Sequence, residues 1–96
     1  MLNKHEILDF LAKQREELSA RFSVRRIGLF GSYLHDAADE HSDVDILVEL
    51  DQPTFDHYMD LKFYLEDRFN RPVDLVLADS VKPRLRPVID REVAYA

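Results

Sequence analysis

Hydrophobic residues recur with a helical period in two segments of this chain, and each segment follows a polar residue suited to capping a helix. In residues 4–20 the apolar positions fall mostly three or four apart, and Asn3 and Glu6 are spaced as in a capping box. The second segment follows Thr54 and keeps the same period as far as Asn70. Both segments are therefore predicted to form amphipathic helices.

Shorter apolar runs lie between and after these helices and are typical of strands. They cover residues 25–30, 44–50 and 73–77, and the second run is the clearest because it is β-branched and alternating. Residues 31–36 are predicted to form a turn leading into a short helix, and residues 86–93 a final short helix after an irregular turn. The order α-β-α-β-α-β-α favours an α/β or α+β fold in which helices pack on a sheet.

Composition narrows the picture to one domain without cysteine chemistry. The chain has 96 residues, 46% of them apolar, which is enough for one core but not for two. Cysteine is absent, which excludes disulfides and thiolate metal sites, and no apolar run is long enough to cross a bilayer. The net charge of −6 argues against DNA or RNA as the main partner, because binding phosphates normally needs a basic surface. We expect a cytoplasmic protein with no membrane partner and no direct contact with nucleic acid.

Two carboxylates at the start of the central strand suggest a metal site. Side chains alternate along a strand, so Asp43 and Asp45 point to the same face, about 6.5–7 Å apart. Carboxylates at that spacing can converge on one hard cation or on a pair of cations, and Mg²⁺ prefers such oxygens together with nucleotide phosphates. The alternative is that both residues simply lie in solvent where a strand begins.

Two further features have a functional and a structural interpretation. Gly31 and Ser32 directly follow a strand, where the glycine allows a sharp turn and the hydroxyl can bind phosphate oxygens. The structural interpretation is a tight turn in which Ser32 caps the next helix. Asp74 lies within an apolar strand, which is unusual for a central strand, so it either faces water from an edge or joins Asp43 and Asp45 in a site.

In combination, these features resemble a known signature. Gly31-Ser32, ten residues, Asp43-x-Asp45 and the later Asp74 together resemble the motif of the polymerase-beta-type nucleotidyltransferase superfamily. The resemblance implies an α+β fold with α/β-type order: one domain over residues 1–96, with a mixed sheet of three to four strands flanked by helices. It also implies that Ser32 holds the nucleotide phosphates, that the first two aspartates bind two Mg²⁺ ions, and that the third carboxylate helps to activate the acceptor.

The end of the chain is similar to one branch of that superfamily. Residues 82–86 and 91–95 resemble the ending of small prokaryotic minimal nucleotidyltransferase (MNT) proteins, which are antitoxins of HEPN/MNT toxin–antitoxin pairs. This resemblance implies an enzyme that transfers AMP from ATP to a tyrosine of a HEPN ribonuclease toxin. The same segment, from Val81 onward, is locally basic. It could contact a triphosphate or a partner, or it could simply form a helix exposed to solvent.

The chain departs from the family pattern in one place. Leu34-His35-Asp36 stand where family members commonly have Ala-Arg-Gly, so an arginine and a glycine are missing from the turn. This departure favours one alternative, an antitoxin that acts by binding alone with an impaired nucleotide site. A second alternative is a small-molecule nucleotidyltransferase of the aminoglycoside-modifying type, against which the short chain argues.

Overall fold

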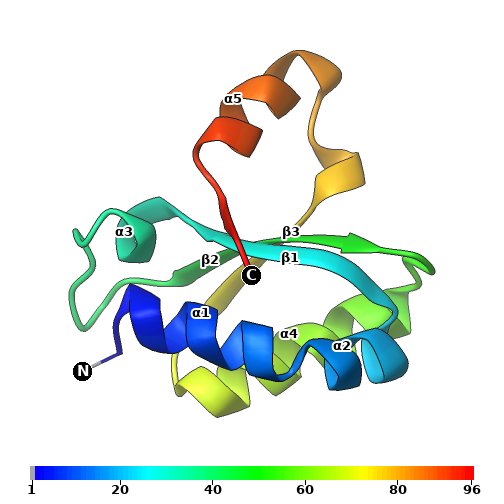
Figure 1. Ribbon diagram of the computed structural model, residues 1–96, viewed down its shortest axis with the longest axis horizontal. Helices are drawn as coiled ribbons and strands as arrows, with labels where there is room; N and C mark the ends of the chain where they lie inside the picture. The colour runs from blue at the N-terminus through cyan, green and yellow to red at the C-terminus, as the bar shows by residue number, and fades with distance from the viewer. Residues whose placement is uncertain (1) are drawn as a thin grey trace.

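The computed structural model describes residues 2–96 and contains a mixed four-stranded sheet (Figure 1). Its strands are β1 (Val24–Phe30), β2 (Val44–Leu50), β3 (Val73–Leu77) and β4 (Ala94–Tyr95), in the order β3-β2-β1-β4. The β2–β3 pair is parallel, and both pairs that involve β1 are antiparallel. The predicted fold is confirmed, with the sheet at the upper end of the expected three to four strands.

Three helices cover one face of this sheet: α1 (Lys4–Lys13), α2 (Arg15–Phe22) and α4 (Phe55–Phe69) (Figure 1). The single helix predicted over residues 4–20 is wrong, because the structure interrupts it at Gln14, which leaves helical geometry with ψ 13°. The positions three and four residues after Leu11 are Gln14 and Arg15, which are polar. At these positions a continuous helix would have no apolar side chain to pack on the sheet. Two separate helices can each turn their own apolar residues inward.

Helix α4 begins and ends where the sequence predicts. The Thr54 hydroxyl accepts a hydrogen bond from the His57 amide at 3.1 Å, which satisfies an otherwise free donor of the first turn. Asn70 ends the helix in the left-handed conformation, with φ 53°. Between these ends, Leu61 and Leu65 are completely buried against the sheet.

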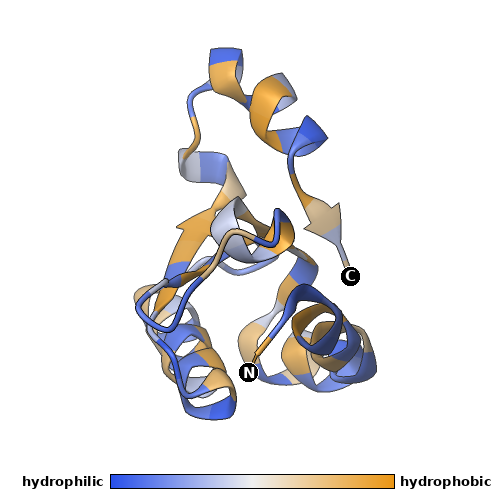
Figure 2. Cartoon of the chain, turned by 90° about the vertical axis from the view of Figure 1, so that its left-hand side faces the viewer, coloured by the Kyte–Doolittle hydropathy of each residue, from blue (hydrophilic) through white to orange (hydrophobic). Residues whose placement is uncertain are grey.

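Alternation along β2 separates the two faces of the sheet. Val44, Ile46 and Val48 belong to the core that the helices cover. Figure 2 shows hydrophobic and hydrophilic positions side by side along these helices, as expected of elements with one buried side. By the same alternation, Asp45 and Glu49 point to the opposite face, which the helices leave uncovered. This open face is where the candidate site lies.

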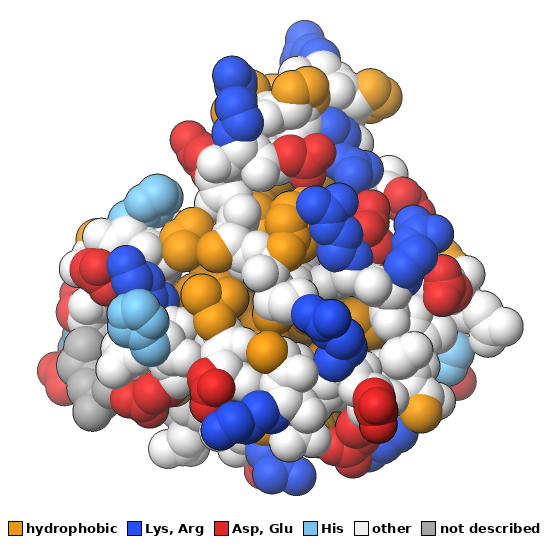
Figure 3. All heavy atoms as spheres, in the orientation of Figure 1, with side chains coloured by type: hydrophobic (Ala, Val, Ile, Leu, Met, Phe, Trp, Pro, Cys, Tyr) orange, Lys and Arg blue, Asp and Glu red, His pale blue; other side chains and the backbone are white. Residues whose placement is uncertain are grey.

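An arm projects from the sheet on its open face (Figure 1). It consists of two short 3₁₀ turns, η1 (Ala78–Ser80) and η2 (Pro83–Leu85), followed by helix α5 (Arg86–Arg91). The predicted final helix is confirmed within two residues at its end, and β4 then returns the chain to the edge of the sheet. Figure 3 shows basic side chains on this arm together with acidic and apolar ones. Within residues 2–96, no helix has both the length and the apolar character that a membrane span requires.

Candidate active site

The candidate site residues meet where β1 ends and β2 begins. The antiparallel register places Phe30, the last residue of β1, opposite Asp45. The parallel register then places Asp45 opposite Asp74 on the neighbouring strand. The chain turns immediately after Phe30 into the short helix α3 (Gly31–Leu34), so the sheet brings Gly31, Asp45 and Asp74 into one row across three segments.

Gly31 is fitted to this position for two independent reasons. Its backbone has φ +76°, in the left-handed region that side chains disfavour. A Cβ atom at this position would overlap the Asp45 carboxylate, whose Cγ would be only 2.8 Å away. The glycine therefore lets the turn press directly against a carboxylate, a close approach that any other residue would prevent.

Asp45 and Asp74 form a close pair of like charges. Burial raises the pKa of the half-buried Asp45 carboxyl, and the negative charges of Asp74 and then Asp43 raise that pKa further. The parallel register places the two aspartates directly opposite each other on neighbouring strands. Burial and repulsion both disfavour the ionised form of Asp45, and a bound cation would offset that repulsion.

Asp43 stands slightly apart from this pair. It precedes β2, is exposed to solvent, and acts on Asp45 through its charge. Across residues 2–96, no three acidic or histidine side chains come close enough together to hold one metal ion. The structure thus brings Asp45 and Asp74 together and leaves Asp43 beside them. The donor set still fits Mg²⁺, which is commonly held by one or two carboxylates and completed by water and nucleotide phosphates.

Ser32 lies at the edge of the site in the first turn of α3. Its carbonyl accepts a hydrogen bond from the Ala37 amide at 2.9 Å, which closes the loop that follows. Its hydroxyl forms no hydrogen bond to any other part of the chain that the structure describes, so it remains available to a ligand. The structural interpretation, Ser32 as a helix cap, is not observed, because Phe30 occupies the cap position.

The departure from the family pattern leaves the turn in a glycine-like conformation. Asp36, at the position of the usual glycine, has φ 56°, and aspartate tolerates the left-handed region better than most residues. Its carboxylate also pairs with Lys4 of α1 at 3.1 Å, which ties the turn to the core. This compensation was missed in the sequence, although a short polar residue at a glycine position is the signal that could have revealed it.

The fold and the row of carboxylates beside a glycine–serine turn define a nucleotidyltransferase. Residues 11–95 match the family described as the nucleotidyltransferase domain, and the chain belongs to this family. It is 43% identical over 96 residues to the protein adenylyltransferase MntA of Thermococcus cleftensis, covering 99% of this chain and 97% of that relative.

Two solved structures share the fold. A minimal nucleotidyltransferase superposes with a TM-score of 0.74 at 34% identity, covering 91% of this chain and 93% of the other. A chain from the complex of a tri-AMPylated Shewanella oneidensis HEPN toxin with its MNT antitoxin superposes with a TM-score of 0.62. It is 21% identical, and the match covers 92% of this chain and 70% of that one.

Proposed function

We propose that this chain transfers AMP from Mg²⁺-bound ATP to a tyrosine hydroxyl of a HEPN-type toxin, and thereby acts as its antitoxin. The observation that carries the proposal is the row formed by Gly31, Asp45 and Asp74 on the open face of the sheet. The family defines the reaction class, and the identity to a protein adenylyltransferase supports AMP as the group transferred. The fold shared with the MNT antitoxin complex supports the kind of partner.

The reaction is an in-line displacement at the α-phosphorus of ATP. The acceptor oxygen forms a bond to that phosphorus while the bond to the bridging oxygen breaks and pyrophosphate leaves. Two Mg²⁺ ions, held by Asp43 and Asp45 and completed by Asp74, would neutralise the triphosphate and stabilise the attacking and leaving oxygens. Ser32, which follows Gly31 at the start of α3, would hold the β- and γ-phosphates.

Asp74 is the residue best placed to handle the acceptor proton. It is exposed on the open face, whereas its neighbour Asp45 is half buried, so an incoming hydroxyl meets Asp74 first. We therefore assign Asp74 to accept or orient the tyrosine proton as the new phosphoester bond forms.

The open face also favours a macromolecular acceptor. Helices cover only one face of the sheet, and the arm from η1 to α5 stands over part of the other. Within residues 2–96 no second lobe encloses the carboxylates in the way that a small acceptor would need. A loop or helix of another protein can supply the missing wall and the tyrosine together.

The test is the intact mass of the toxin after incubation with the chain, ATP and Mg²⁺. The wild-type chain is expected to add whole adenylyl units, and the Asp43→Ala/Asp45→Ala variant to add none while still binding the toxin. Asp67→Asn, an exposed carboxylate on α4, is the matched control and should leave transfer intact. A toxin that binds the wild-type chain but remains unmodified would contradict transfer and favour an antitoxin that acts by binding alone. Full turnover by Asp45→Asn would overturn the site assignment.

A further inference from the structure

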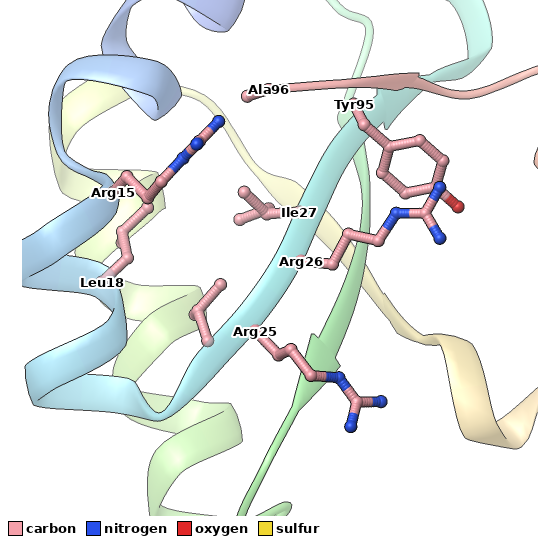
Figure 4. A pocket seen from close by; sticks show the side chains of 8 residues that line it. Arg15, Leu18, Arg25, Arg26, Ile27, Tyr95 and Ala96 are labelled. Atoms are coloured by element: carbon pink, nitrogen blue, oxygen red, sulfur yellow. The ribbon is translucent and has the colours of Figure 1, made fainter.

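A groove of about 230 Å³ runs along the first half of β1, at the opposite end of this strand from the carboxylates (Figure 4). It lies between the strand and the beginning of α2, and the end of β4 closes it on one side. The residues that line it are Arg15, Leu18, Val24, Arg25, Arg26, Ile27, Tyr95 and Ala96. From Arg26 to Gly31 the strand advances roughly 16 Å, which places the groove outside the transfer site.

The groove follows a strand edge that is only half paired. On this side of β1, β4 pairs with Gly28 and Leu29, and the Ala96 amide donates to the Ile27 carbonyl at 3.0 Å. In the part of the chain that the structure describes, no strand pairs with residues 24–26 on that side. An exposed edge of this kind can accept an added strand, which is a common mode of peptide recognition.

Apolar side chains form the floor of the groove. Leu18 is completely buried, and Ile27 and Val24 are 4% and 8% exposed. All three belong to the core that α1, α2 and α4 share with the sheet. A strand added along β1 would turn every second side chain toward this floor, where an apolar side chain would extend the existing core.

Three arginines surround that floor in a chain whose net charge is −6. Figure 4 shows Arg15 reaching from α2 toward Ala96, while Arg26 lies against the Tyr95 ring, 3.5 Å from its centroid. Neither forms an ion pair with another residue between 2 and 96. Arg25 lies 3.5 Å from the Asp51 carboxylate and 4.0 Å from that of Glu49. Two uncompensated guanidinium groups therefore remain to receive acidic groups.

These features select among possible occupants. Pairing of this edge with a second copy would bring Arg25 and Arg26 close to the same arginines of that copy, and like charges across strands are destabilising. A free phosphate would use the arginines but neither the apolar floor nor the free backbone of β1. An extended peptide with acidic and apolar side chains uses all three.

We propose that this groove docks an extended segment of a partner protein, in which acidic and apolar residues alternate, as an added strand beside β1. The apolar side chains point to the face of Leu18 and Ile27, where Arg15 borders the groove. The acidic side chains point to the opposite face of the added strand and contact Arg26. Because the groove is remote from Asp45, a partner held there leaves the open face free. The proposal concerns binding alone and stands or falls independently of AMP transfer.

The test is an NMR titration of the ¹⁵N-labelled chain, without ATP or Mg²⁺, using a short acetylated and amidated peptide of alternating glutamate and valine. The expected result is a set of amide shifts centred on residues 24–27. The Arg26→Glu variant is expected to raise the dissociation constant by about tenfold or more. Arg84→Glu, on the exposed part of the arm, is the matched control and should bind as the wild type does.

Two modified peptides test the mode of binding without altering the protein. Replacing each glutamate by lysine should abolish binding, and N-methylation of alternate amides should do the same by removing the backbone donors. Any of three results would overturn the proposal: amide shifts confined to other regions, equal affinity of the charge-reversed variant, or undiminished binding of the methylated peptide. It would also be overturned if inorganic phosphate, and not the peptide, shifted the amides of residues 24–27.

Discussion

The conformation and size of Gly31 are matched to the position of the Asp45 carboxylate, which lies directly beside it. The glycine backbone turns through a left-handed conformation and leaves only enough space for the carboxylate beside it. Asp45 in turn lies opposite Asp74, and burial first, then the negative charge of Asp74, raises the pKa of the Asp45 carboxyl. The site that we propose thus combines a strained turn with repulsion between carboxylates, both of which a purely structural turn would avoid.

Replacing Gly31 by alanine is expected to cost about 2 kcal/mol or more in the free energy of unfolding and to abolish transfer. The added Cβ overlaps the Asp45 carboxylate and also disfavours φ +76°. Chemical denaturation and the toxin-modification assay measure the two effects. Asn70→Ala is the control, because Asn70 is also left-handed but lies outside the site. It should cost about 1 kcal/mol and leave transfer unchanged, and equal loss of activity in both variants would contradict the account.

Asp45→Asn is expected to stabilise the chain while abolishing transfer. Without Mg²⁺ the substitution removes the like charge opposite Asp74, so Tm should rise by roughly 2–4 °C in the presence of a chelator. Differential scanning calorimetry measures the shift, with Asp67→Asn as the control that should leave Tm unchanged. A lower Tm for Asp45→Asn would show that the pair stabilises the fold and that repulsion has been assigned wrongly.

Among the elements, the arm is anchored to the sheet in part by Arg86. Arg86 donates to the Ala78 carbonyl at 3.0 Å and lies 3.6 Å from the Glu49 carboxylate, so it links α5 both to η1 and to the sheet. Arg86→Ala should lower the free energy of unfolding by about 1 kcal/mol and increase hydrogen exchange across residues 78–92. Arg84→Ala removes a similar charge from an exposed position and should change neither quantity. Unchanged exchange in Arg86→Ala would mean that other contacts hold the arm.

Helices α2 and α4 are joined by a pH-sensitive contact. Tyr64 of α4 donates to Glu17 of α2 at 3.0 Å, and Arg21 donates to the same carboxylate at 3.1 Å. The Tyr64 hydrogen bond, then that of Arg21, lowers the pKa of Glu17 from its ordinary value of 4.5. The stability that this contributes is fully present above that ordinary value, and it is lost as the pH falls through the lowered pKa of the folded state.

Tyr64→Phe should therefore lower Tm at neutral pH and make the loss of stability below pH 4.5 less steep. Tyr58→Phe is the matched control, because the Tyr58 hydroxyl donates to the Leu75 carbonyl, a group that does not titrate. That variant should lose stability by a similar amount at every pH. Thermal melts over a series of pH values separate the two behaviours, and parallel curves for both variants would contradict the assigned role of Glu17.

The sequence predicted elements best where local signals are strong. The strands at residues 44–50 and 73–77 and helix α4 were predicted within about a residue, because alternation and capping residues mark their limits. The break at Gln14 was not predicted, since the apolar period continues on both sides of it. Strand β4 was not assigned to its residues, because two residues carry no period and depend on pairing with Gly28 and Leu29.

For the whole molecule, the sequence predicted which residues would form the site but not how they are arranged. That Asp45 and Asp74 lie side by side depends on the parallel pairing of β2 with β3, a non-local choice that no short pattern fixes. Asp36 compensates for a missing glycine through a contact with Lys4, far away in the sequence. One face of the sheet is left open by the distribution of all the helices, and this openness is what favours a macromolecular acceptor.

The measurement that tests the central claim most directly follows radioactive phosphorus from ATP into the toxin, with the label placed in either the α- or the γ-phosphate. Transfer of AMP predicts label on the toxin from the α-position alone, and none with Asp43→Ala/Asp45→Ala. Label from the γ-position would identify a kinase reaction. Absence of label from both positions, with the complex intact, would contradict catalysis by this chain.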